Sequence, residues 1–161
     1  MTTLNTPLTV LEIPVPPEWV DYNGHLNVGY YNVAFDKATD ALFDRLDIGI
    51  DYLTRTNNSF FTLETHVAYL QEVLEGDMLR FEAQILGCDE KRLHAFFSMY
   101  HVDGDYLSAT SEQMCVHVDL GQRRTAAMAE DVMLRINALF KAQAHLPVPD
   151  GAGKSIGMKR R

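Results

Sequence analysis

The stretch VGYYNVAFDKATDALFDRL, residues 28–46, decides how the rest of the chain is expected to fold. Its apolar side chains recur every three or four positions, which is the period of one face of an α-helix, and Gly49 follows as a plausible helix stop. The apolar face is broad, so we expect other structure to surround much of this helix. The residues that form this face are Val28, Tyr31, Ala34, Phe35, Ala38, Ala41, Leu42 and Leu46.

Segments with a period of two lie on both sides of this helix and predict β-strands. One strand, one long helix and then four strands in hairpin succession predict an α+β domain, in which an antiparallel five-stranded sheet wraps around the helix. Because one helix covers only one face of a sheet, we expect a homo-oligomer, a dimer or a tetramer, to cover the other face and the edges. The expected strands are 8–15, 61–69, 79–85, 93–99 and 106–119, and a further short helix is expected over 130–144.

Composition and charge limit the classes of function. The chain has 161 residues, 47% of them hydrophobic, which is enough for one core, and its net charge of −8 argues against a nucleic-acid or anionic-membrane partner. Cys88 and Cys115 lie in apolar runs without C-x-x-C spacing, which indicates reduced thiols rather than metal ligands or a disulfide. With no basic leader and no apolar run of transmembrane length, we expect a cytoplasmic protein.

Two regions are expected along the chain. Residues 1–146 should form the single domain. Residues 147–161 are rich in proline and glycine and end in Lys159-Arg160-Arg161, which predicts a flexible basic tail.

The loop before the long helix concentrates polar side chains. Asp21-Tyr22-Asn23-Gly24 has turn chemistry, and Asn27 is a good N-cap, so this loop has a purely structural explanation. The loop is, however, longer than capping requires, and the Asp21 carboxylate can face the free N–H groups at the helix N-terminus, near Asn27 and Val28. A carboxylate opposite such donors can attack a polarised carbonyl or activate water, which is a hydrolytic arrangement.

The motif Asp21-x-x-Gly24-His25-x-Asn27 with Tyr31, together with the later pair Gly76-Asp77, resembles the signature of hotdog-fold acyl-CoA thioesterases of the 4-hydroxybenzoyl-CoA thioesterase type. The segments VPPEWVDYNGHL, FFTLETHVAYL, DEKRLHAFF and ATSEQMCVHVD are similar to a subgroup associated with, or fused to, carnitine dehydrogenase and assigned to betainyl-CoA hydrolysis. Residues 26–31 instead follow the general thioesterase pattern. The resemblance covers roughly residues 8–135 and implies a hotdog fold and hydrolysis of an acyl-CoA to free acid and coenzyme A.

The resemblance also implies roles for individual residues. Asp21 matches the family's catalytic carboxylate, and the backbone N–H of Val28 matches the donor that polarises the thioester carbonyl. His25, Asn27 and Tyr31 match positions that support or line the substrate site. Such a hydrolysis needs no metal and no cofactor, and the sequence offers no His/Cys cluster with metal-ligand spacing.

Two further groups of residues are candidates for the substrate site. Glu64 and His66 share one strand face, which is either solvated or turned toward the pocket, and the carnitine-linked subgroup carries the same Glu-Thr-His. A trimethylammonium acyl group would be held by aromatic faces, although core packing explains most aromatic residues equally well. The aromatic candidates, of which Trp19 and Tyr22 flank Asp21, are Trp19, Tyr22, Tyr30, Tyr31, Phe60 and Tyr69.

Basic residues are scarce, so their positions are informative. Lys91-Arg92 and Arg123-Arg124 are candidates for binding the phosphates of coenzyme A, although hairpin ends are often simply charged. Two other functions remain open at this point. One is a hydratase of acyl thioesters on the same fold, and the other is a non-catalytic module that binds an acyl thioester or a small ligand.

Overall fold

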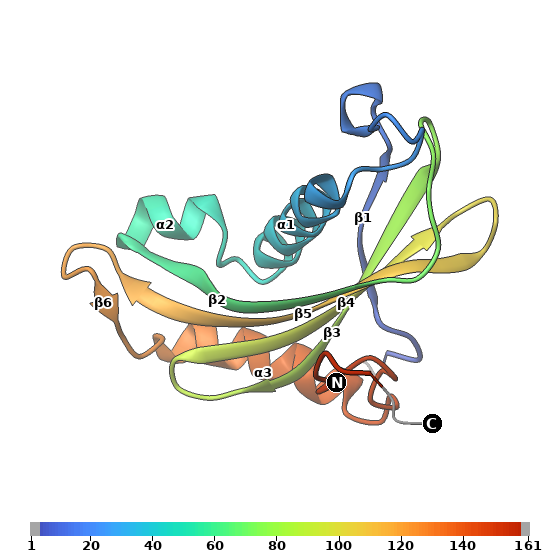
Figure 1. Ribbon diagram of the computed structural model, residues 1–161. Helices are drawn as coiled ribbons and strands as arrows, with labels where there is room; N and C mark the ends of the chain where they lie inside the picture. The colour runs from blue at the N-terminus through green and yellow to red at the C-terminus, as the bar shows by residue number, and fades with distance from the viewer. Residues whose placement is uncertain (1–3, 159–161) are drawn as a thin grey trace.

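The computed structural model describes residues 4–158 (Figure 1). An antiparallel sheet curls around the long helix α1 on one side, while α3 lies on the other side. The elements in chain order are β1 (Leu8–Pro14), a 3-10 helix (Pro17–Trp19), α1 (Val28–Arg45), α2 (Ile50–Thr56), β2 (Asn58–Tyr69), β3 (Met78–Cys88), β4 (Arg92–His101), β5 (Tyr106–Asp119), β6 (Arg124–Thr125) and α3 (Glu130–Gln143). The predicted α+β architecture of five strands around one long helix is confirmed.

The expected succession of hairpins is wrong at one position. β2 pairs with β5, from Asn58↔Asp119 to Tyr69↔Ala109, and does not pair with β3. The sheet order is therefore β1-β3-β4-β5-β2, with β6 added beside β5. A period of two shows which side chains share a face, but it does not show which strand is the neighbour.

The prediction that Gly49 ends the long helix is also wrong. This residue is the N-cap of α2 and does not end α1, whose C-cap is Leu46. α2 has seven residues, and Tyr52 is the one that is buried, so it lacks the repeated apolar face that makes a helix visible in a sequence. The two-residue strand β6 is likewise too short for a period to be seen.

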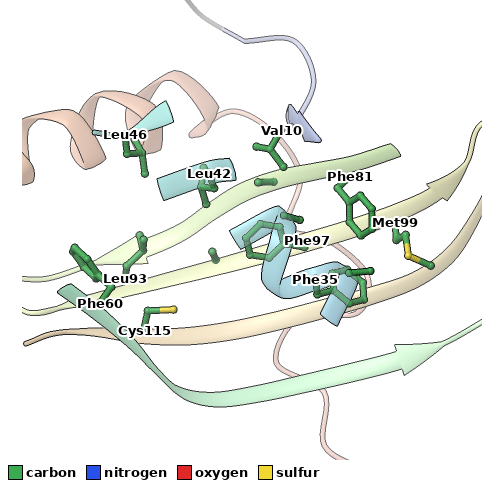
Figure 2. Packing of buried hydrophobic residues seen from close by; sticks show 14 of the residues in the cluster. Val10, Phe35, Leu42, Leu46, Phe60, Phe81, Leu93, Phe97, Met99 and Cys115 are labelled. Atoms are coloured by element: carbon green, nitrogen blue, oxygen red, sulfur yellow. The ribbon is translucent and has the colours of Figure 1, made fainter. Parts of the chain in front are cut away.

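The core lies between α1 and the inner face of the sheet (Figure 2). The rings of Phe35 and Phe81 meet edge to face with their centroids 5.6 Å apart, and both side chains are fully buried. The polar side chains within this core are paired, since the hydroxyl of Thr39 lies 3.0 Å from Oε1 of Gln113. This packing fixes the helix axis and with it the position of the N-terminus of α1.

The outer face of the sheet is covered by the chain itself, in part by α3. The side chain of Gln143 accepts from the N–H of Ile85 at 2.9 Å and donates to the carbonyl of Ala83 at 2.9 Å, at the end of the β1–β3 pairing, whose last pair is Leu8↔Ala83. The prediction that an oligomer is needed to cover the outer face of the sheet is therefore wrong where α3 lies on that face. The edge strand β2 pairs with a neighbour on one side only, and its side chains Phe61 and Leu63 are 45% and 61% exposed.

The segment after α3 runs along the same outer face. The N–H of Gly153 donates to the Glu112 carboxylate at 2.7 Å, and a side chain at Gly151 would come within 3.0 Å of the Phe96 ring. Gly153 has φ +69°, a conformation that favours glycine. The flexibility of the tail remains a prediction, and its basic end, Lys159-Arg160-Arg161, lies outside the described residues. Across residues 4–158, no helix combines the length and hydropathy that a membrane span requires.

Candidate active site

The loop that carries Asp21 is a closed turn held at both ends. Asp21 N–H donates to the carbonyl of His25 at 3.1 Å, and Gly24, with φ +84°, donates to the carbonyl of Asp21 at 2.9 Å. Below the turn, Asn27 N–H donates to the carbonyl of Trp19, and Leu26 N–H donates to that of Val73, both at 2.9 Å. The backbone around Asp21 is therefore fixed against the 3-10 helix and against the link between β2 and β3.

The Asp21 carboxylate is partly exposed and accepts two hydrogen bonds. Its Oδ1 accepts from the N–H of Asn23 at 2.8 Å, and its Oδ2 accepts from the side-chain amide of Asn27 at 3.4 Å. These two hydrogen bonds fix the orientation of the carboxylate, and the one from Asn27 ties it to the start of α1.

The N-terminus of α1 offers one free donor beside this carboxylate. Asn27 caps the helix, because its Oδ1 accepts from the N–H of Gly29 at 2.9 Å. The N–H of Val28 comes first in the helix, has no intrahelical acceptor, and finds no other acceptor within residues 4–158. The dipole of this 18-residue helix strengthens the attraction of that N–H for an oxygen with negative charge.

A cleft of about 320 Å³ opens next to Val28. His25, Val28 and Tyr31 line one side, and Tyr69, Leu70 and Glu72 line the other. Tyr31 is buried at its base, and its ring meets that of Tyr69 edge to face with centroids 5.0 Å apart. Burial, with smaller effects of the neighbouring Tyr106 and Glu72, raises the pKa of Tyr31, so its phenol is neutral at physiological pH.

The structure places His25 and Tyr31 at the cleft, and their roles toward a substrate stay a prediction. The His25 Nδ1 lies 3.2 Å from the carbonyl of Leu26 and must donate to it, which leaves Nε2 as the other ring nitrogen and an acceptor in the neutral ring. Asn27 supports the site through Asp21 and the helix cap and does not line the cleft.

Trp19 and Tyr22 were expected at the substrate, and the structure places both outside the cleft. Trp19 is 8% exposed and stacks on Tyr30 with ring centroids 5.7 Å apart, so it anchors the loop. Tyr22 is 97% exposed at the tip of the turn. Phe60, another aromatic candidate, packs on Phe43 at the other end of α1. A loop sequence does not show which way Trp19 and Tyr22 project, and the period of a strand does not show which end of α1 the ring of Phe60 contacts.

Glu64 and His66 lie on the outer face of the sheet and not beside α1. Between them Thr65 faces α1, where it lies close to Gln113, so alternation turns its two neighbours away. They line a separate cavity of about 610 Å³ between the sheet and the tail. Within one chain, the expectation that they join the site beside α1 is therefore wrong, because the sequence pattern did not show which face was inner.

The candidate residues for coenzyme A phosphates lie at the far end of the sheet. Lys91 lies in the turn between β3 and β4, and Arg92 is the first residue of β4. Arg123 precedes β6 and Arg124 begins it, near α2, whereas the loop with Asp21 is at the opposite end (Figure 1). Arg92 is paired with Asp89 at 2.6 Å, and Lys91 with Glu90 at 3.4 Å. The structure does not bring these four side chains to the cleft of the same chain.

Tyr69, already among the aromatic candidates, lines the cleft, but Leu70 and Glu72 were not expected there. They belong to the link between β2 and β3, which has no period, and reach the site because the N–H groups of Leu70 and Gln71 donate to the carbonyl of Ser108 at 2.9 and 3.1 Å. Only the pairing of β2 with β5 would have revealed them. In the part of the chain that the structure describes, no three His, Cys, Asp or Glu side chains are grouped to hold a metal ion.

Residues 15–136 match the family model of the Thioesterase-like superfamily, and the chain belongs to this family. It is 43% identical to the betainyl-CoA thioesterase of Pseudomonas aeruginosa, over 94% of this chain and 95% of that protein. It is also 38% identical to an L-carnitine dehydrogenase/betainyl-CoA thioesterase of a Rhizobium species, of which it spans only 31%.

Solved structures agree with this family. A putative thioesterase from Pseudomonas putida superposes with a TM-score of 0.83 at 39% identity and covers 96% of this chain and 98% of its own. A Staphylococcus aureus protein solved in complex with CoA gives a TM-score of 0.88 at 25% identity, over 98% of this chain and 100% of its own. The expected hotdog fold of the thioesterases is confirmed.

Proposed function

We propose that this chain is an acyl-CoA thioesterase and that its substrate is betainyl-CoA, hydrolysed to betaine and coenzyme A. One observation in the structure carries the reaction class. The Asp21 carboxylate and the free N–H of Val28 stand at the same helix N-terminus, next to a cleft of about 320 Å³. The relatives named for betainyl-CoA, aligned over nearly the whole of this chain, support the choice of acyl group.

In the proposed mechanism, the thioester carbonyl oxygen accepts a hydrogen bond from Val28 N–H, which stabilises the negative charge that develops on that oxygen. Asp21 then acts in one of two ways. As a nucleophile, its oxygen bonds to the carbonyl carbon, the C–S bond breaks and the thiolate of coenzyme A leaves; water then cleaves the resulting anhydride. As a base, it takes a proton from the water that attacks the same carbon, and the C–S bond then breaks and releases the thiolate of coenzyme A. Neither route requires a metal or a redox cofactor.

The exposed edge of β2 supports an oligomer. Phe61 and Leu63 on β2 and Val33 on α1 are exposed apolar side chains, at 45%, 61% and 40%, beside an unpaired strand edge. A second copy that pairs along β2 would bury them, so we propose a homodimer. The molar mass in solution would show whether two such dimers pair into a tetramer. The free thiols Cys88 and Cys115 fit a cytoplasmic enzyme.

The test is thiol release from a panel of acyl-CoAs: betainyl-CoA, short straight-chain, branched and aromatic thioesters. Asp21→Asn keeps the size of the side chain but removes its charge, and should lower kcat/KM by about a hundred- to ten-thousandfold. Asp103→Asn, in the exposed turn between β4 and β5, is the matched control and should keep wild-type activity. No release from any thioester by the wild type, with retained binding, would replace the enzyme by a binding module.

A further inference from the structure

The cleft beside Val28 combines aromatic rings with a carboxylate, a combination that suits few acyl groups. Two phenol rings, those of Tyr31 and Tyr69, share it with the carboxylate-bearing residue Glu72. An uncharged acyl chain forms no favourable interaction with a carboxylate, because binding the chain beside the carboxylate removes water from the charge and offers no hydrogen bond in return. A cation gains from both the rings and the carboxylate.

We infer that Glu72, together with the rings of Tyr69 and Tyr31, recognises the positive charge of the acyl group and makes the enzyme selective for a quaternary ammonium. This inference rests on the proposed function and assigns the residues that set its specificity. A quaternary ammonium has no N–H to donate, so aromatic faces and a nearby negative charge are the interactions left to it.

The positions of the rings fit the short distance between charge and carbonyl in a betainyl group. One methylene separates the nitrogen from the carbonyl carbon, so the cation must lie within one side chain of the donor that holds the carbonyl oxygen. Tyr31 is three residues after Val28, on the same side of α1. Tyr69, 47% exposed, closes the cleft from the end of β2, with its ring at 74° to that of Tyr31.

Glu72 is held in place by its backbone, and its charge is not cancelled. Its carbonyl accepts a hydrogen bond from the hydroxyl of Tyr106 at 2.8 Å, and the preceding residue, Gln71, bonds to Ser108. Among residues 4–158, no lysine, arginine or histidine forms an ion pair with Glu72. The carboxylate is therefore available to a ligand cation.

The experiment compares two substrates of the same shape. In 3,3-dimethylbutanoyl-CoA a carbon atom replaces the nitrogen of betainyl-CoA, so the ratio of the two kcat/KM values measures recognition of charge alone. Glu72→Gln should lower this ratio about tenfold or more, because the loss should fall mainly on the charged thioester. Tyr69→Leu should also lower the ratio, because it removes the exposed ring. Glu75→Gln, an exposed carboxylate three residues further along the same link, is the matched control and should leave the ratio unchanged.

The outcomes separate this inference from the proposed function. An unchanged ratio in Glu72→Gln, an equal loss on both substrates, or a wild type that prefers the neutral thioester would overturn the inference while the thioesterase stands. If the wild type releases no thiol from either substrate, the proposed function fails. Calorimetric binding of the same two thioesters to wild type and Glu72→Gln then still decides whether Glu72 recognises the charge.

Discussion

The side chain of Asn27 connects the Asp21 carboxylate to the first turn of α1. Its amide donates to Asp21 Oδ2 at 3.4 Å, and its own Oδ1 accepts from Gly29 N–H at 2.9 Å. One residue therefore caps the helix and orients the carboxylate, so its two roles can be separated by substitution.

Asn27→Asp keeps the helix cap, because aspartate caps as well as asparagine, but it places a second carboxylate against Asp21. Like charges raise each other's pKa, so the acid limb of the pH profile of kcat/KM should move to higher pH, with little change in the free energy of unfolding. Asn27→Ser, which caps without adding charge, should lower activity and move that limb less than Asn27→Asp does. An unchanged pH profile in Asn27→Asp would show that Asp21 is not the ionising group.

Tyr52→Phe tests a buried polar pair at the other end of α1. The Tyr52 hydroxyl donates to His117 Nε2 at 2.8 Å, while His117 Nδ1 lies 3.0 Å from the carbonyl of Ala126, to which it donates. Without the hydroxyl, a buried ring nitrogen loses its partner, so the free energy of unfolding in urea should fall by about 1–3 kcal/mol. Tyr22→Phe, at an exposed position, is the control and should change it by less than about 0.5 kcal/mol. Equal effects of the two substitutions would contradict the pairing.

Asp89 makes stability depend on pH in the acid range. Bonds from the Arg92 guanidinium and from the N–H groups of Lys91 and Arg92 hold the pKa of the Asp89 carboxyl at about 2. An unfolded aspartate titrates near about 3.9, so the stabilisation is fully present above that pH and is lost as the pH falls through about 2. The difference in Tm between wild type and Asp89→Asn should therefore be constant near neutral pH and shrink below about pH 4. A difference that does not vary with pH would contradict this assignment.

The two thiols should react at different rates in the native protein. Burial raises the pKa of both the Cys88 and the Cys115 thiols, which keeps them protonated and weakly nucleophilic. Cys115 is 1% exposed and Cys88 is partly exposed, so alkylation at pH 8, followed by mass spectrometry, should modify Cys88 first. Both should react at once in denaturant. Equal native rates would mean that the β5 core opens readily.

Most of the fold could be predicted from the sequence because its elements carry strong periods. The apolar stripe from Val28 to Leu46 marks α1, and alternation marks β2 to β5. The pairing of β2 with β5 could not be predicted, since it depends on how α1 directs the chain across the sheet and not on any local pattern.

The candidate site was predicted only where it is local in sequence. Asp21, Asn27 and Val28 lie within one loop and a helix start, so cap and turn chemistry relate them. Glu72 reaches the same cleft through backbone bonds to β5, which no spacing shows. Glu64 and His66 were assigned by resemblance, and their strand faces outward.

The pairing of β2 with β5 also has a consequence for synthesis on the ribosome. Asn58 is paired with Asp119, so the apolar edge strand β2 leaves the ribosome well before the strand that will hold it. β3, β4 and β5 can add to one another as each emerges, but β2 must wait for the last of them. The nascent chain therefore carries an unpaired, aggregation-prone strand while residues 70–119 are synthesised, and completion of the sheet is a late, slow step of folding.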